Sequence, residues 1–412
     1  MPVELRRMGS AVRRSLPFFV LVVALCAVPY PAAAQPPVPF DDPAWVIEGE
    51  GTIIEQYLDR QALRLRTGIA RLPSVGFENG RIEFEFATSG RRSFVGVRFR
   101  MDSDQDCEYI YFRPHNSGKW DAMQYTPIDR GQTSWQLFSG QGYGAAVAIP
   151  PDRWIHVRVE VAGSRAQVFV DRSTSPVLTV TDLKRGRSRG GVALFSLYPA
   201  SGSDDHVPTA FTGFSVVPSD VDATYKRRMP PPAGSGLIGS WSVHPPIATP
   251  DEPLSVLPRD GIDPLQWFRV DSEESGIVNF ATVAGLPRGG GTILARVFIH
   301  SDRRQTKKLD FGFSDRAVLF VNGRPVFSGD NTYRSRSPRF LGIMTVDHTA
   351  VYLALEEGDN ELLFAVSEAF GGWGLIARLK DRDGIELRTE PPAGTVPIRR
   401  SAGMALSGPT GE

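Results

Sequence analysis

The chain has 412 residues, of which 41% are hydrophobic and 22% charged, and its 46 lysines and arginines balance 46 aspartates and glutamates. This balance argues against nucleic acid as the main partner, because no basic excess is present to neutralise phosphates. A chain of this length can form two domains with separate hydrophobic cores.

The N-terminal segment has the layout of a secretory signal peptide. Four arginines precede the apolar run LPFFVLVVALCAV, and small residues follow at Ala32 and Ala34. We therefore expect residues 1–34 to be cleaved off and the mature chain to be periplasmic or extracellular. A lipoprotein signal would use Cys26, but the bulky Leu25 before it disfavours that alternative.

Removal of this segment changes the charge and the cysteine content of the chain. It takes away four arginines and one acidic residue, which leaves 42 basic and 45 acidic residues. Cys107 is then the only cysteine, so no intramolecular disulfide can form. No later apolar run reaches the ~18 residues that a membrane span requires, and we expect no membrane-spanning segment.

Short runs of alternating hydrophobic and polar residues dominate residues 43–218. In GRIEFEF (80–86), the apolar residues share one side of a strand and the glutamates share the other. FVGVRFRM (94–101) and WIHVRVEV (154–161) follow the same pattern. Several such strands separated by turns predict an antiparallel β-sandwich, and we expect no amphipathic helix in it.

The stretch EYIYFRPHNSGKWDAMQYTP (108–127) has two different faces if its first half is a strand. Ile110 and Phe112 can enter a core, because side chains of a strand alternate between the two sides. The opposite face then carries Tyr109, Tyr111, Arg113 and His115. This face is either a wet exterior or a binding surface.

The remaining chain predicts a linker and a second sandwich. Residues 219–236 are rich in proline, glycine and charge, which is typical of a linker. Alternating strands resume in 237–389, where Asn322-Gly323 predicts a type I′ hairpin turn because both residues tolerate positive φ. Gly358-Asp359-Asn360 predicts a similar turn, and the tail 390–412 is expected to be disordered. The predicted fold class is all-β, with two tandem antiparallel β-sandwiches (jelly rolls) after a signal peptide.

Both halves resemble known families. The segments FENGRIEFEF, FVGVRFR, YIYFRPHNSGKWDAMQYTP and DRWIHVRVEV occur in the first half in this order, which resembles the concanavalin A-like (laminin G and glucanase) jelly rolls. Within that superfamily, the half is most similar to the domain of unknown function related to keto-glycoside hydrolases. The second half, with FGFSDRAVLFVNGRPVFSG, LALEEGDNELLFAV and FGGWG, resembles galactose-binding-like jelly rolls. These resemblances imply carbohydrate handling, with the ligand on the concave sheet of the first domain.

The polar face of residues 108–115 is the main candidate for a ligand site. Aromatic rings offer flat apolar plates and arginines offer forked donors, which suit hydroxyl-rich or acidic sugars. The arginines of FVGVRFRM join this face if that run is the neighbouring strand. The alternative is an exposed sheet face without a ligand. The predicted ligand-binding residues are Arg98, Arg100, Tyr109, Tyr111, Arg113, His115, Trp120, Gln124 and Trp373. The alternative for Trp373, which the flanking glycines favour, is that it caps a core while the glycines relieve crowding at a strand bend.

A catalytic site is not expected. A glycoside hydrolase needs two carboxylates about 5 to 9.5 Å apart, and the laminarinase-type pattern Glu-x-Asp-x-x-Glu is absent from the sequence. Glu83 and Glu85 share a strand face, but this spacing is also ordinary on a wet strand. Glu108 and Glu160 are weaker alternatives for a catalytic carboxylate.

A metal site is not expected either. Asp102, Asp104 and Asp106 occupy alternate positions, which suggests calcium because hard cations bind clustered carboxylates. An EF-hand loop would need glycine at Cys107 and glutamate at Arg113, so a solvated hairpin tip is favoured. The sequence therefore predicts no cofactor, although structural calcium at loops distant in sequence stays open.

Together, these patterns predict a secreted or periplasmic carbohydrate-binding protein without catalysis. Its partner would be an oligosaccharide or polysaccharide, bound on the first sandwich. One alternative is a glycoside hydrolase or lyase that acts in the same cleft. A further alternative is an envelope or adhesion module that binds other proteins.

Overall fold

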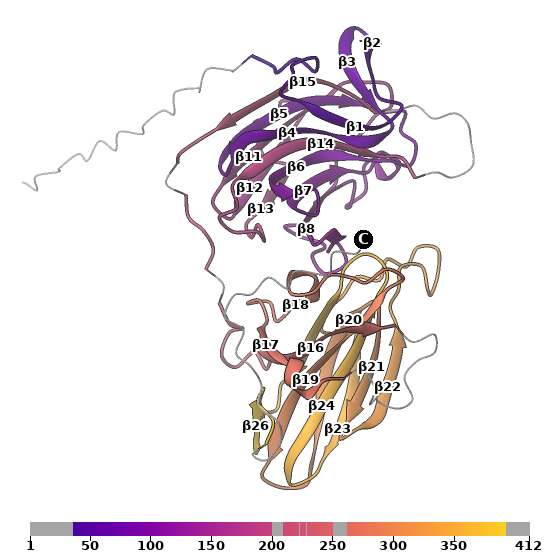
Figure 1. Cartoon of the computed structure of the whole chain (residues 1–412). Coiled ribbons are helices and arrows are strands. Elements are labelled where there is room, and N and C mark those ends of the chain that lie inside the picture. The colour runs from indigo at the N-terminus through magenta and orange to yellow at the C-terminus, as the bar shows by residue number, and fades with distance from the viewer. Residues whose placement is uncertain (1–35, 200–208, 222, 228, 250–261, 393–412) are drawn as a thin grey trace, which may run out of the picture. The chain divides into compact units, whose positions relative to one another are not determined.

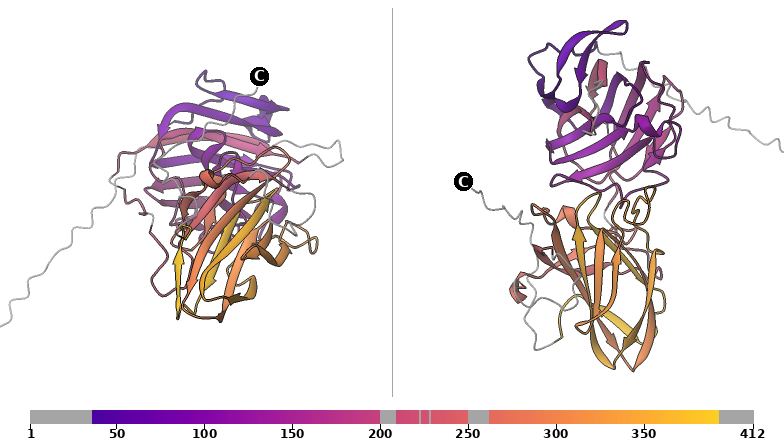
Figure 2. Two further views of the ribbon diagram at one scale, coloured as in Figure 1. Left: turned by 60° about the horizontal axis from the view of Figure 1, so that its bottom comes forward. Right: turned by 90° about the vertical axis from the view of Figure 1, so that its right-hand side faces the viewer.

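The computed structural model describes residues 36–199, 209–221, 223–227, 229–249 and 262–392. In these ranges the strands form four antiparallel sheets, which make two successive β-sandwiches (Figures 1 and 2). The prediction of an all-β fold with tandem sandwiches is confirmed. The predicted signal peptide and nearly all of the predicted C-terminal tail lie outside the described residues.

The first sandwich consists of the first and second sheets. The first sheet has the order β1-β4-β14-β6-β7-β8-β10, with β9 on β8. In that order its strands span Val46–Glu50, Thr67–Phe77, Gly190–Leu197, Phe94–Ser103, Asp106–Phe112, Met123–Asp129 and Gly144–Ala145, and β9 spans Gln132–Thr133. The second sheet has the order β13-β12-β11-β5-β15-β3-β2. Its strands span Leu178–Val180, Arg165–Val170, Ile155–Ala162, Gly80–Ala87, Thr209–Pro218, Arg60–Leu65 and Ile53–Tyr57.

The second sandwich consists of the third and fourth sheets. The third sheet has the order β17-β16-β19-β24-β21-β22, with β26 on β19. Its strands span Phe268–Asp271, Ser240–Ala248, Gly291–Ser301, Gly358–Glu368, Arg316–Val321 and Arg324–Asp330, and β26 spans Ile385–Arg388. The fourth sheet has the order β18-β25-β20-β23. Its strands span Val278–Asn279, Gly374–Leu379, Gln305–Ser314 and Thr349–Leu355. Within the described ranges, the helices are three short 3-10 turns at Pro114–Asn116, Pro264–Gln266 and Phe280–Thr282. None of them has the length and apolarity that a bilayer crossing requires.

Alternation decides which side chains form each core. In β5, Ile82, Phe84 and Phe86 are fully buried in the core of the first sandwich. Asn322 and Gly323 join β21 to β22 with φ of +49° and +74°, as a type I′ turn requires. The turn predicted at 358–360 lies earlier, because β24 already begins at Gly358.

The first part of the predicted linker packs onto the first sandwich. The backbone N–H of Ser219 donates to the carbonyl of Asn79 at 2.9 Å, at the turn between β4 and β5. Ser164, at the turn between β11 and β12, donates its N–H to the carbonyl of Thr224 at 3.1 Å and accepts from the N–H of Lys226 at 2.7 Å. These hydrogen bonds fix the course of the chain after β15.

Gln136 connects the two sandwiches. It follows β9 in the first sandwich and is fully buried. Its backbone N–H donates to Gly371 at 3.1 Å, and its carbonyl accepts from Met344 at 2.9 Å. Its side-chain amide donates to the carbonyl of Leu341 at 3.0 Å and accepts from the Ser314 hydroxyl at 3.0 Å. A single side chain is therefore satisfied entirely by groups of the second sandwich.

Replacement of Gly163 tests the packing of the linker segment. Gly163 has a φ of +60°, and an added Cβ would lie 1.9 Å from the carbonyl oxygen of Thr224. Gly213 is a matched control, because its φ is +63° but nothing lies within 4 Å of an added Cβ. We expect Gly213→Ala to lower the free energy of unfolding by about 1 kcal/mol, the cost of the backbone conformation. Gly163→Ala should cost about 2 kcal/mol more because of the clash. Equal losses in urea unfolding would contradict this packing.

Candidate functional site

The predicted polar face lies on the side of the first sheet that points away from the core, here called the outer face. Ile110 and Phe112 belong to the core of the first sandwich, as predicted. Tyr109 and Tyr111 belong to a separate cluster on the opposite side of β7. In the neighbouring strands, Arg98 pairs with Tyr109, and Gln124 pairs with Tyr111. The alternation predicted for residues 108–115 is therefore confirmed as far as Phe112, where β7 ends; Arg113 follows the strand, and His115 lies in the 3-10 turn Pro114–Asn116.

The two tyrosines of the outer face are packed rather than open. Each is only 5% exposed, and their rings stack with centroids 4.8 Å apart. The guanidinium group of Arg98 lies 5.3 Å from the ring centroid of Tyr109 and 3.9 Å from that of Phe195. Burial raises the pKa of both tyrosines, so their hydroxyls stay protonated. The expectation that these rings stand open to a ligand is wrong, because their neighbours across the sheet cover them.

A network of polar side chains runs from the tyrosines to the loop before β8. The hydroxyl of Tyr111 donates to Oε1 of Gln124 at 2.7 Å, and Arg113 donates to the same atom at 3.3 Å. Arg113 also forms an ion pair with Asp121, whose carboxylate accepts from the amide of Asn116 at 3.0 Å. This network holds the guanidinium group of Arg113 in one position.

The loop between β7 and β8, which carries Asn116 and Asp121 of this network, also contains the most exposed of the predicted ligand-binding residues. Trp120 is 47% exposed, and the adjacent Lys119 donates to the side-chain carbonyl of Asn116 at 3.3 Å. Burial, assisted by nearby arginines, lowers the pKa of His115 to about 4. Its imidazole is therefore neutral at pH 7. The outer-face network and this loop together form the candidate site.

Arg100 does not lie on the outer face, and its predicted role there is wrong. The pairing of β6 with β7 is regular up to Phe99 and resumes only at Ser103. Arg100 has a φ of +50° in this irregular part, so the alternation that would place it beside Arg98 is broken. It is fully buried, and burial lowers its pKa. Its guanidinium donates to the carbonyls of Glu78, Gly163 and Gly186 and to the side-chain oxygen of Asn79.

Trp373 is a core residue of the second sandwich, so its predicted placement at a ligand site is also wrong. It is fully buried and its indole N–H donates to the carbonyl of Val366 at 2.9 Å. Its ring centroid lies 6.2 Å from that of Phe280. The glycines beside it relieve crowding, since an added Cβ at Gly372 would lie 2.5 Å from Leu137.

Four buried polar atoms near the outer face have no hydrogen-bond partner. They are the hydroxyl of Tyr109, Nδ1 of His115, and Nε of Arg98 and Arg113. A buried hydroxyl without a partner costs free energy, whereas one with a partner does not. The sequence gives no signal for these atoms, because their isolation depends on the packing of side chains that are distant in sequence.

The carboxylates weighed for catalysis are engaged with neighbouring groups. Glu83 lies 3.1 Å from Nε of Arg81 and 3.7 Å from His156, and Glu85 forms an ion pair with Arg60. Glu160 lies 3.2 Å from Nε of Arg158. On this sheet the acidic side chains therefore alternate with basic ones.

Glu108 is a buried structural acid. It is fully buried, and burial raises its pKa. Its carboxyl group accepts from the hydroxyl of Tyr125 at 2.6 Å and from the backbone N–H of Arg185 at 2.9 Å. These bonds tie β7 and β8 to the segment that precedes β14.

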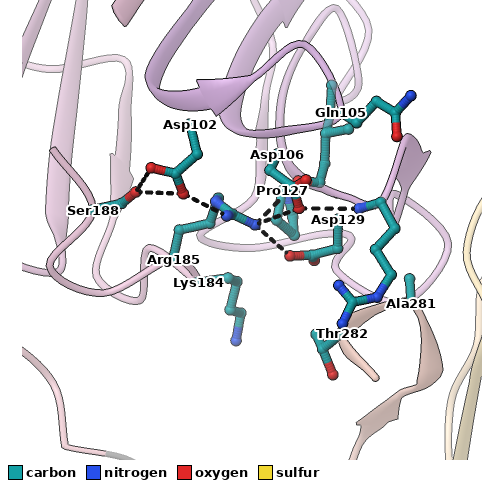
Figure 3. Close-up of polar contacts among 12 residues, drawn as sticks. Asp102, Gln105, Asp106, Pro127, Asp129, Lys184, Arg185, Ser188, Ala281 and Thr282 are labelled. Carbon is teal, nitrogen blue, oxygen red and sulfur yellow. Dashed lines mark hydrogen bonds and ion pairs between the residues drawn. The ribbon is translucent and has the colours of Figure 1, made fainter. Parts of the chain in front are cut away.

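The alternating aspartates are held by arginines. Arg185 bridges Asp102, Asp106 and Asp129 at 3.0, 3.3 and 2.8 Å, as Figure 3 shows. Asp104 instead forms an ion pair with Arg71. Among the described residues, no group of three or more histidine, cysteine, aspartate or glutamate side chains could hold a metal ion.

A further pair of acids was not predicted from the sequence. Burial raises the pKa of Asp315 to about 6, and burial together with the charge of Asp315 raises that of Glu368 to about 8. Asp315 accepts from the backbone N–H groups of Ala369 and Phe370 at 3.0 Å each. Because the two acids are more than 50 residues apart in the sequence, no local motif could reveal their pairing.

The chain is similar in fold to several solved structures. No protein-family model and no curated protein matches it. About 42% of the chain is similar to 93% of the carbohydrate-binding module CBM66 from Bacillus subtilis, at 13% identity and a TM-score of 0.30. About 42% is similar to 92% of a Bacillus licheniformis β-glucanase, at 10% identity and a TM-score of 0.30. About 25% is similar to 73% of a family 35 carbohydrate-binding module from an environmental isolate, at 18% identity and a TM-score of 0.18. At these values the similarities identify no ligand for this chain.

Two tyrosine variants test the packing of the outer face. Tyr109 and Tyr111 are neighbours with the same burial, but only the hydroxyl of Tyr111 has a partner. We expect Tyr109→Phe to raise the free energy of unfolding by about 1 kcal/mol, because it removes an unpaired buried hydroxyl. Tyr111→Phe should lower it by about 1 kcal/mol, because it removes the shorter of the two hydrogen bonds that Oε1 of Gln124 accepts. Urea unfolding measures the change in the free energy of unfolding for each variant. Changes in the same direction would contradict the conclusion that only the Tyr111 hydroxyl is hydrogen-bonded.

The buried acid pair predicts a pH dependence of stability. The folded-state pKa of Glu368, about 8, lies above that of an unfolded chain, so the folded state binds a proton more strongly. Its contribution is complete below about pH 4.5 and is lost as the pH rises to about 8. Relative to Glu368→Gln, the wild-type free energy of unfolding should therefore fall by about 1 kcal/mol or more between pH 5 and pH 8. The exposed Glu357→Gln is the control, and it should follow the wild type. Parallel pH profiles for wild type and Glu368→Gln would refute the raised pKa of Glu368.

Proposed function

We propose that the protein binds carbohydrate without catalysis, at the end of the outer face where the polar network meets the Trp120 loop. One observation carries this proposal. The exposed ring of Trp120 adjoins a loop whose buried side carries the linked side chains of Asn116, Asp121 and Arg113. An aromatic plate beside fixed donors and acceptors is suited to a sugar ring and its hydroxyls.

The rigidity of the network favours binding. Arg113 is held by Asp121 and Gln124, so a ligand would not have to order this long side chain. Side-chain ordering costs about 0.5–1.5 kcal/mol for each flexible residue that a ligand immobilises. Lys119, which is exposed, would still have to be ordered. Because an open loop leaves much of a ligand in water, we expect dissociation constants of roughly micromolar to millimolar for one site.

Binding rather than hydrolysis agrees with the state of the acids. Glu83 and Glu85 form ion pairs, and Glu108 is buried and hydrogen-bonded to Tyr125. None of these three is a free carboxylate beside Trp120. The proposed ligand is an oligosaccharide or polysaccharide outside the cytoplasm, since the N-terminal segment has the pattern of a secretory signal peptide.

Replacement of Trp120 tests the proposal. A glycan array with the chain from residue 35 onward identifies the bound sugar, and calorimetric titration then compares variants with that sugar. We expect Trp120→Ala to weaken binding about fivefold, which corresponds to about 1 kcal/mol for loss of ring contact. Tyr352→Ala is the control, because Tyr352 is 74% exposed but belongs to the second sandwich.

Two outcomes would refute the proposed function. In the first, the chain binds no glycan on the array but binds protein partners that sugars do not displace, as expected of an adhesion module. The other is a bound glycan whose affinity is the same for wild type and Trp120→Ala. Release of reducing ends from the bound glycan would show a hydrolase or lyase instead.

A further inference from the structure

The first sandwich contains a pocket of about 240 Å³ that is lined by none of the residues proposed above. It is formed by the turn between β4 and β5, the segment between β13 and β14, and the chain that follows β15. Its charged lining residues are Glu78, Arg187, Arg189 and Asp220, and Asn79, Ser219 and Tyr225 add polar groups. Ligand pockets for drug-sized molecules begin near 300 Å³, so this volume suits a smaller group such as one sugar ring.

The walls of the pocket are held in place by hydrogen bonds. Tyr225 donates its hydroxyl to Glu78 and accepts from the side-chain amide of Asn79 at 3.0 Å. Asn79 in turn accepts from the backbone N–H of Gly163 at 2.8 Å. The chain after β15 is fixed by the bond from Ser219 to Asn79. This part of the wall is therefore formed before any ligand binds.

Two arginines give the pocket its anion-binding character. Arg187 lies over the ring of Tyr225 at 4.5 Å, and within the described part of the chain no ion pair holds its guanidinium. Arg189 donates its Nε to the carbonyl of Gly76 at 3.0 Å, which leaves its two terminal nitrogens available. Both residues are exposed. Behind Tyr225, the buried Arg100 donates only to uncharged acceptors, so it adds positive charge that no directly bonded carboxylate cancels.

The same pocket also carries acceptors. The carboxylates of Glu78 and Asp220 line it. In the part of the chain that the structure describes, no ion pair joins either of them to Arg187 or Arg189. An inorganic anion would use the arginines but would be repelled by these acids. A molecule with one carboxylate and several hydroxyls satisfies both sets, because guanidinium groups bind carboxylates and carboxylates accept from hydroxyls.

We propose that this pocket binds a single sugar acid of the uronate class. Its carboxylate lies between Arg187 and Arg189, and its hydroxyls donate to Glu78 and Asp220. The ring of Tyr225 positions Arg187 rather than stacking on the sugar, because guanidinium groups already lie on it. This site is separate from the Trp120 loop, so its existence does not depend on the proposed function.

The test is a calorimetric titration of the chain from residue 35 onward with glucuronate, galacturonate, glucose, galactose and inorganic phosphate. We expect the uronates to bind at least tenfold more tightly than the neutral sugars and phosphate. Arg187→Gln and Arg189→Gln should each weaken uronate binding about tenfold, since each removes one charged donor. Arg324→Gln is the matched control, because Arg324 is an exposed arginine on β22 of the second sandwich.

The variants separate this site from the other one. Trp120→Ala should leave uronate binding unchanged, and Arg187→Gln should leave binding of the array-identified glycan unchanged. The proposal is overturned if the uronates give no binding heat, or if Arg187→Gln and Arg189→Gln bind them as the wild type does. It is also overturned if phosphate binds as tightly as the uronates, because the acids would then contribute no recognition of hydroxyls.

Discussion

The buried guanidinium group of Arg100 organises the first sandwich. It donates to the carbonyls of Glu78, Gly163 and Gly186, which belong to three separate connections between strands. Hydrogen bonds from a charged group contribute about 1.5–3 kcal/mol each, whereas a buried charge without them is strongly destabilising. The three connections are therefore held together around one side chain. The same turn of the backbone that buries Arg100 also removes it from the outer face, and it places positive charge behind the pocket at Tyr225.

The residues that the sequence assigned correctly are those controlled by local geometry. Alternation placed Ile110 in the core and Tyr109 on the opposite side, because strand periodicity does not depend on distant residues. The turn at Asn322-Gly323 was predicted because both residues tolerate positive φ, which is also a local property of the chain. Arg100 was misplaced because a positive φ outside glycine interrupts β6, and no pattern of hydrophobic residues signals such a break. The burial of Tyr111 was missed because it results from contacts with Phe94 of β6 and Gln124 of β8, which are distant in sequence.

Composition was an incomplete guide to the segment between the sandwiches. Proline, glycine and charge predicted a linker at 219–236, but its first part makes backbone hydrogen bonds to two turns of the first sandwich. Gln136 adds a contact between the sandwiches that uses both its backbone and its side chain. Such bonds involve backbone groups, which every residue carries, so residue types alone do not reveal them. The pocket was missed for the same reason, since one of its walls is this segment.

The two proposed sites differ in what a ligand must order. At the Trp120 loop, Arg113 is fixed by Asp121 and Gln124, and the free part of the site is an exposed ring with two flexible bonds. Little entropy is lost there, but little ligand surface is buried. In the pocket, the wall is fixed by Tyr225, while the ends of Arg187 and Arg189 are exposed and must be ordered. Contact between Arg187 and the ring of Tyr225 reduces that cost, because the guanidinium plane is already restrained. Charge complementarity between the ligand and the two arginines can then outweigh the remaining entropy cost of ordering their side chains. We therefore expect the pocket to select its ligand by charge, and the Trp120 loop to select its ligand by shape.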